Sequence, residues 1–113
     1  MQHSLSALLT CFHQKRITLE KIVEKACHNP SILFDIKDRG YLREGFFADL
    51  VIIDLQKYYN VKKSNILYKC GWSPFENITF KGTVEKTFVN GQLAYDKGKI
   101  SNKPTARPLT YNR

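Results

Sequence analysis

The 113-residue sequence predicts an α+β protein in which two or three short helices precede a mostly β part. Apolar residues recur with a helical period before residue 39 and with a strand period after it. Between these halves, two glycine turns lead into the apolar run Leu50–Ile53, which Asp54 closes. Four such residues between turn residues are typical of a strand that is buried on both faces. We therefore expect two domains, residues 1–38 and residues 39–113.

Three helices are expected in the first domain. The first has an apolar stripe at positions i, i+3, i+4 and i+7, with Ser4 as its N-cap. The stripe consists of Leu5, Leu8, Leu9 and Phe12. The second helix begins after Thr18, which is a good N-cap. Its buried face would consist of Leu19, Ile22, Val23 and Ala26. Asn29 and Pro30 then restart a short third helix, with the asparagine as its cap.

The clearest local prediction in the second domain is a β-hairpin. Residues 83–89 and 92–96 alternate in polarity, and the Asn90-Gly91 pair between them favours a type I′ turn. The opposite pairs in this register are Phe88 with Leu93 and Lys86 with Tyr95. Residues 55–63 are polar and rich in tyrosine, and we expect them to form a loop.

Composition limits the classes of function. The net charge is +8, but the 18 Lys and Arg residues are spread along the chain, which favours a solvated basic surface over a nucleic-acid interface. The sequence has neither the apolar run of about 18 residues that a membrane span needs nor a signal-peptide layout. The three cysteines, Cys11, Cys27 and Cys70, are widely spaced, which favours reduced thiols and a cytoplasmic location.

The residues that could carry chemistry do not form a catalytic pattern. The three histidines, His3, His13 and His28, contain no His-x-His pair, whereas a catalytic zinc needs three protein ligands. Cys11 and Cys27 lie near apolar helix faces, which favours buried, unreactive thiols. We therefore expect no catalytic residue, no metal ligand and no cofactor in this chain.

Two segments resemble a known family. Residues 40–54, with the pattern Gly-x-Leu-x-Glu-Gly-x-x-Ala-Asp-Leu-Val-Ile-Ile-Asp, resemble the segment of the amidohydrolase superfamily that leaves the catalytic barrel and enters a small β-sandwich. Residues 68–76, Tyr-Lys-Cys-Gly-Trp-Ser-Pro-Phe-Glu, resemble dihydroorotases, and a looser version of this pattern is shared with allantoinases and hydantoinases. Asn77 departs from the family, which usually has glycine there, but asparagine tolerates a left-handed conformation.

The resemblance covers nearly all of this chain but only about the last quarter of a dihydroorotase. It implies that residues 1–38 end the (β/α)₈ barrel and that residues 39–113 form part of a composite β-sandwich. It also implies a parent enzyme that uses zinc to interconvert N-carbamoyl-L-aspartate and L-dihydroorotate in pyrimidine biosynthesis. The family's zinc ligands and catalytic aspartate lie upstream of the matched segment, so we expect the 113-residue chain alone to be inactive.

The resemblance assigns only Gln2 and His3 a place near the substrate, because they follow the family's substrate-binding loop. It also implies that strands of the composite sandwich are missing here, and unpaired strand edges recruit other chains. We therefore expect a homo-oligomer, or association with the missing N-terminal portion of the enzyme, and neither nucleic acid nor membrane as a partner. Two alternatives stay open, a non-catalytic β module for protein interaction and the C-terminal part of an allantoinase or hydantoinase. A nucleic-acid-binding protein ranks third.

Overall fold

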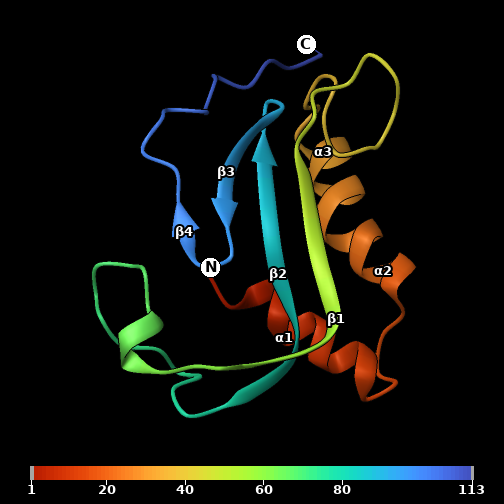
Figure 1. Cartoon of the computed structure of the whole chain (residues 1–113). Coiled ribbons are helices and arrows are strands. Elements are labelled where there is room, and N and C mark those ends of the chain that lie inside the picture. Colours follow the sequence, from red (N-terminus) through yellow and green to blue (C-terminus); the bar gives the residue numbers. More distant parts are fainter. Residues whose placement is uncertain (1, 113) are drawn as a thin grey trace. The chain divides into compact units, whose positions relative to one another are not determined.

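A computed structural model describes residues 2–112 and contains short helices and one four-stranded sheet (Figure 1). In chain order the elements are α1 (Ser4–His13), α2 (Leu19–Val23), the π-helical turn η1 (Glu24–His28), α3 (Asn29–Leu33), β1 (Leu50–Asn60), the 3-10 turn η2 (Lys63–Asn65), β2 (Thr79–Val89), β3 (Gln92–Asp96) and β4 (Lys99–Ile100). The strand order is β1-β2-β3-β4, and β3 pairs antiparallel with both neighbours. The predicted α+β class is confirmed.

The chain divides into two compact units. Unit 1 consists of Met1–Thr18 and Ile53–Val84, and unit 2 consists of Leu19–Ile52 and Glu85–Arg113. Strands β1 and β2 contribute residues to both units. The division at residues 38 and 39 concerns the domains of a longer enzyme and stays a prediction. None of the helices formed by residues 2–112 is long and apolar enough to cross a membrane.

Unit 1 is built on close contact between α1 and β2. Its buried apolar side chains are Leu9, Val61 and Phe80. Gly82 has φ +104°, and a Cβ atom at this position would lie 2.6 Å from the Cβ of Leu9. The Lys81 N–H group donates a 3.0 Å hydrogen bond to the Thr10 hydroxyl, which fixes the helix on the strand. The predicted apolar stripe is therefore confirmed at its centre, where Leu9 is only 1% exposed.

The prediction that Ser4 is the N-cap of α1 is wrong. His3 occupies the N-cap position without a side-chain cap hydrogen bond, and Ser4 is the first helical residue. The physical reason is that the His3 side chain is buried in a cluster of aromatic rings, so the helix starts where that packing places it. No side-chain hydrogen bond from His3 therefore caps the N-terminus of α1.

Strand β1 differs from the sequence-based expectations in its length and in the burial of its apolar run. It continues to Asn60, so the predicted loop at residues 55–63 is wrong for most of its length. The apolar run at its start is not buried on both faces, because Val51 is 47% and Ile52 is 50% exposed. The reason is that β1 is an edge strand of the sheet, which an apolar run alone does not reveal.

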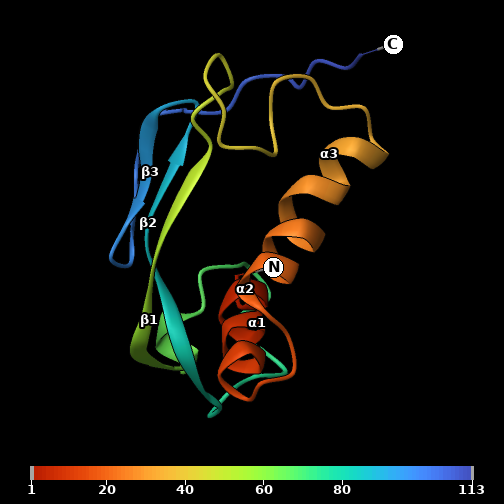
Figure 2. The same cartoon turned by 90° about the vertical axis from the view of Figure 1, so that its right-hand side faces the viewer.

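In unit 2, α2, η1 and α3 form one continuous helical rod (Figure 2). Asn29 has φ −61° and ψ −42°, so it lies within the rod and does not cap a new helix as expected. The π-helical turn before it accommodates the junction without a break. Of the predicted buried face, Ile22 is buried and Leu19 is half-buried, whereas Val23 and Ala26 are exposed.

The predicted hairpin forms, with one change of register. Asn90 and Gly91 have φ values of +53° and +77°, as a type I′ turn requires, and Phe88 pairs with Leu93. The expected pair of Lys86 with Tyr95 is wrong, because a bulge between residues 87 and 88 shifts the register. An extra residue in one strand is not visible in the alternation of polarity. The left-handed conformation predicted for Asn77 is confirmed by its φ of +67°.

A polar network that the sequence did not predict joins three segments of unit 2. The guanidinium of Arg39, a buried residue, donates hydrogen bonds to the Asp49 carboxylate and, at 2.7 Å, to the Asn90 side-chain oxygen. The Asn90 amide group donates in turn to the Thr105 carbonyl at 2.6 Å. The network therefore holds the hairpin turn, the segment before β1 and the C-terminal tail together.

Candidate functional site

His3 is the polar centre of an aromatic cluster in unit 1. Its side chain is nearly fully buried, with 4% of the residue exposed. Four aromatic rings have their centroids 6.0 to 6.4 Å from the imidazole. These rings belong to Tyr59, Tyr68, Phe75 and Phe80. Burial in these surroundings lowers the pKa of His3 from its ordinary value of 6.5, so the imidazole is neutral at pH 7.

The buried residue Ser73 holds this imidazole at one ring nitrogen. Its Oγ lies 3.2 Å from Nδ1 of His3 and accepts a 3.1 Å hydrogen bond from the Phe75 N–H group. If the Ser73 hydroxyl donates to Nδ1, the His3 proton lies on Nε2, and only that N–H group is left without a partner. The other tautomer would leave two groups unpaired, the hydroxyl hydrogen and Nε2. Buried unpaired polar groups are costly, so the Nε2–H tautomer is favoured.

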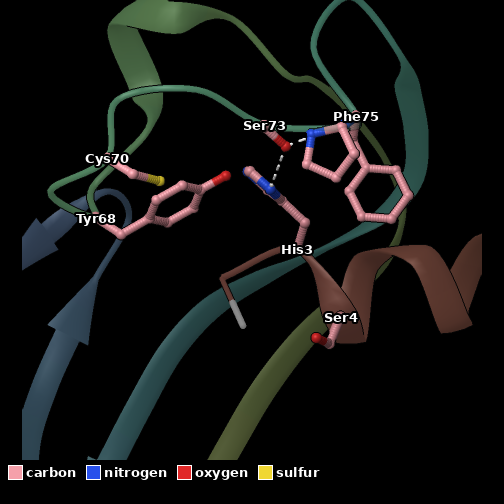
Figure 3. Close-up of a pocket in the computed structure, with 7 residues that line it drawn as sticks. His3, Ser4, Tyr68, Cys70, Ser73 and Phe75 are labelled. Carbon is pink, nitrogen blue, oxygen red and sulfur yellow. Dashed lines mark hydrogen bonds between the residues drawn. The ribbon is translucent and has the colours of Figure 1, made fainter.

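An open pocket of about 330 Å³ adjoins the imidazole. Its lining includes His3, Ser4, Tyr68, Cys70, Ser73 and Phe75. Figure 3 shows the His3 ring standing between the hydroxyl groups of Tyr68 and Ser73. Nε2 of His3 is buried and has no hydrogen-bond partner among residues 2–112. The pocket therefore has aromatic walls, and the imidazole in its lining keeps one buried nitrogen without a partner.

Gln2 connects the start of the chain to residues 65–67, which precede the loop that contains Ser73. Its side-chain amide donates a 2.8 Å hydrogen bond to the Asn65 carbonyl, and its Oε1 accepts a 2.9 Å bond from the Leu67 N–H group. Gln2 and His3 thus both bind residues 65–75, one through the backbone and the other through Ser73. Their place at the edge of a substrate loop stays a prediction.

The metal donors of the chain do not fit a zinc site. Across residues 2–112, no three His, Cys, Asp or Glu side chains come together in a way that could hold a metal ion. The Nδ1 of His3 is bonded to Ser73, and Nε2 of His13 lies 2.6 Å from the Leu55 carbonyl. The ring of His28 stacks on Tyr41 with a centroid distance of 4.2 Å. Each imidazole is therefore used in packing or hydrogen bonding, where three converging ligands would be needed.

The cysteines differ in part from the expectation of buried thiols. Cys27 is exposed and Cys11 is half-buried, while Cys70 is exposed beside the pocket. Ala26, the neighbour of Cys27 on the helical rod, is exposed as well. No thiol lies in a disulfide within the described part of the chain.

Comparison with known proteins gives a consistent result. Residues 2–94 match the model of the amidohydrolase family. A dihydroorotase of Pyrococcus horikoshii is 33% identical over 104 residues, which is 92% of this chain and 25% of that protein. An allantoinase of Desulfitobacterium hafniense is 31% identical over 109 residues, covering 96% of this chain and 24% of that protein.

Solved structures agree with these relatives. The L-hydantoinase (dihydropyrimidinase) of Arthrobacter aurescens superimposes with a TM-score of 0.79 at 33% identity, over 87% of this chain and 22% of that chain. The chain thus spans about a quarter of the length of the curated relatives that it matches. Most of the fold of this chain is therefore also present in that longer L-hydantoinase.

Proposed function

Because the chain belongs to the amidohydrolase family, we propose that it is the carboxyl-terminal part of a dihydroorotase-type cyclic amidase. The observation that carries this proposal is the 33% identity to a dihydroorotase over 92% of the chain. Residues 68–76 lend support, because the loop that carries the dihydroorotase-like sequence contributes Tyr68, Ser73 and Phe75 to the cluster around His3. The reaction of the whole enzyme would be the reversible cyclisation of N-carbamoyl-L-aspartate to L-dihydroorotate in the cytoplasm.

The part played by this chain would be structural. Its histidines are engaged in packing and hydrogen bonds, and its donor set does not fit zinc, so the metal and the groups that act on substrate would come from the rest of the enzyme. Residues 1–38 would complete the barrel wall, and residues 39–113 would form part of the composite sandwich. Gln2 and His3 would fix the segment that follows the substrate loop.

Exposed apolar side chains support a role as one part of a larger assembly. In unit 2, Leu33 at the end of the helical rod is 74% exposed, and Ile32 and Phe34 beside it are also exposed. Val51 and Ile52 add apolar surface on an edge strand, where backbone groups can accept a further strand. Covering such surface stabilises by about 25 cal/mol per Å². We infer that the rest of the enzyme covers it, and that the isolated chain associates with itself.

The genomic sequence upstream of the Met1 codon gives the first test. We expect an adjoining frame, or a separate gene, that encodes a His-x-His motif and a lysine-bearing barrel. Its product combined with this chain should hydrolyse dihydroorotate. The matched control is the same combination with Leu9→Asp, which places a charge in the core of unit 1 and should abolish the gain. Activity that is the same with and without this chain would contradict the proposal.

A second candidate is the corresponding part of an allantoinase or hydantoinase. It is favoured by the 31% identity to an allantoinase over 96% of the chain and by the superposition on an L-hydantoinase. The combined enzyme should therefore be assayed with dihydroorotate, allantoin and a substituted hydantoin in parallel. The dihydroorotase proposal predicts the highest kcat/KM for dihydroorotate, and a preference for either other substrate would replace it by this candidate.

A further inference from the structure

We propose that Asn90 in unit 2 is a deamidation site that the folded chain protects, and that its deamidation releases the C-terminal tail, residues 101–112. Asn90 is the only asparagine of the sequence that a glycine follows. Glycine has no Cβ that would hinder the approach of its backbone nitrogen to the preceding side chain, so an Asn-Gly pair favours this reaction. All of the residues involved belong to unit 2, and the site does not depend on the proposed function.

Deamidation at this position takes place in two steps. The Gly91 backbone nitrogen loses its proton and attacks Cγ of Asn90, so a C–N bond forms and the side-chain nitrogen leaves as ammonia. The product of this step is a five-membered succinimide ring. One water molecule then opens the ring at either of its two carbonyl carbons, which gives aspartate or isoaspartate. The net reaction consumes one water molecule and releases one ammonia molecule.

The fold holds the attacking nitrogen and the reacting carbon apart. In a type I′ turn the ψ angle of the first central residue is about +30°, which places the Gly91 nitrogen on the far side of the Cα–C bond from the Asn90 Cβ. The Gly91 N–H group donates a 3.0 Å hydrogen bond to the Ala48 carbonyl, so this nitrogen keeps its proton. The Asn90 N–H group donates to the Asp49 carboxylate at 2.8 Å, which further fixes the turn. Attack on Cγ therefore requires that the turn open.

The Asn90 side chain is held at both of its polar ends. Its oxygen accepts a 2.7 Å hydrogen bond from the Arg39 guanidinium, and its amide group donates to the Thr105 carbonyl at 2.6 Å. Arg39 would also stabilise negative charge on this oxygen during attack, which by itself favours the reaction. The positioning effect decides between the two, because charge develops on the oxygen only after the nitrogen reaches Cγ. The rate in the folded chain is then set by the fraction of molecules with an open turn.

Deamidation would remove the contact that holds the tail. In the aspartate product a carboxylate oxygen replaces the amide group that donates to the Thr105 carbonyl, so two hydrogen-bond acceptors would face each other. Arg39 can still donate to the other oxygen, and an Asp-Gly pair also favours a type I′ turn, so the hairpin should remain. The isoaspartate product adds one atom to the backbone of the turn and should disturb the pairing of Phe88 with Leu93 as well.

The protection is tested by comparing the folded 113-residue chain with the same chain unfolded in guanidinium, both at mildly alkaline pH. Peptide mapping by mass spectrometry follows the conversion of each asparagine. In the unfolded chain Asn90 should convert fastest, and in the folded chain its rate should be lower by about tenfold or more. Asn102 is the internal control, because it is exposed and precedes a lysine, and it should convert slowly in both samples. Equal rates at Asn90 in the two samples would overturn the protection.

The release of the tail is tested with Asn90→Asp, which has the covalent structure of the aspartate product. The Lys37 N–H group donates to the Thr110 carbonyl at 2.9 Å, so exchange of the Lys37 amide hydrogen reports whether the tail is attached. We expect this exchange to be about tenfold faster in Asn90→Asp than in the original chain. The exchange of the Gly91 amide hydrogen should stay slow, because the hairpin remains folded.

Asn102→Asp is the matched control, because it adds the same charge to the tail at an exposed position. Its Lys37 amide should exchange as in the original chain. Equal exchange at Lys37 in both variants would show that Asn90 does not hold the tail. Fast exchange at Gly91 in Asn90→Asp would mean that the whole hairpin opens, which would also contradict the proposed release of the tail alone.

Discussion

The hydroxyl oxygen of Ser73 lies 3.2 Å from Nδ1 of His3, although 70 positions separate the two residues in the sequence. This contact joins the residue before α1 to the loop that leads into β2. Ser73→Ala removes the hydroxyl and leaves buried Nδ1 without its partner, so we expect the free energy of unfolding to fall by about 1–3 kcal/mol. Urea denaturation measures this change, and Ser64→Ala, at an exposed position of η2, is the control that should change little. Equal effects of both substitutions would show that the contact does not stabilise the chain.

His3 also makes stability depend on pH. Its folded-state pKa is lowered by burial, so below its ordinary value of 6.5 the unfolded chain binds a proton that the folded chain resists. The stabilising contribution is therefore complete above pH 6.5 and is lost progressively as the pH falls toward the folded pKa. Urea midpoints between about pH 7.5 and 5 measure this loss. His3→Gln should flatten the pH dependence of the urea midpoint, whereas His28→Gln should leave that dependence unchanged. The reverse pattern would show that another group causes the pH dependence.

The close approach of α1 to β2 predicts a large effect of a single methyl group. Gly82→Ala combines a strained φ of +104° with a Cβ position 2.6 Å from the Cβ of Leu9. Gly98→Ala is a matched control, because its φ is +93° but nothing lies within 4 Å of the added Cβ. We expect Gly82→Ala to lower the free energy of unfolding by about 1–3 kcal/mol more than Gly98→Ala, the usual range for overpacking. Equal losses in chemical denaturation would mean that only backbone strain acts at both sites.

The exposed apolar residues of unit 2 predict self-association of the isolated chain. Light scattering should give a mass of about twice 13.1 kDa or more at high concentration. Ile52→Lys, on the exposed edge strand, should shift this equilibrium toward the monomer, whereas Gln56→Lys on the same strand should shift it less. A clean monomer at high concentration, with no binding of a dye that detects apolar patches, would mean that the chain buries its apolar surface sufficiently by itself.

The features that follow from short-range chemistry were predictable from the sequence. The Asn90-Gly91 turn forms because two consecutive residues accept positive φ, and Asn77 takes the left-handed conformation for the same reason. The stripe around Leu9 gives α1 because its period is helical. In each case the determining residues lie within a few positions of one another.

The features that depend on distant partners were not predictable in this way. The apolar run at Val51 and Ile52 is the same whether its strand is central or at an edge, and only the strand order decides its exposure. The contact of His3 with Ser73 and the network around Arg39 join residues far apart in the chain. One signal for the site was present, because Gly71 and Pro74 mark a loop around Ser73.

The proposed role of this chain, the non-catalytic carboxyl-terminal part of a cyclic amidase, is tested by its own activity and zinc content. The purified 113-residue chain is assayed for hydrolysis of L-dihydroorotate after equilibration with zinc, and the bound zinc is counted in the same sample. We expect no turnover above the enzyme-free control and no stoichiometric zinc, because the described residues offer no set of three metal ligands. Turnover by the chain alone that a chelator abolishes and added zinc restores would contradict it.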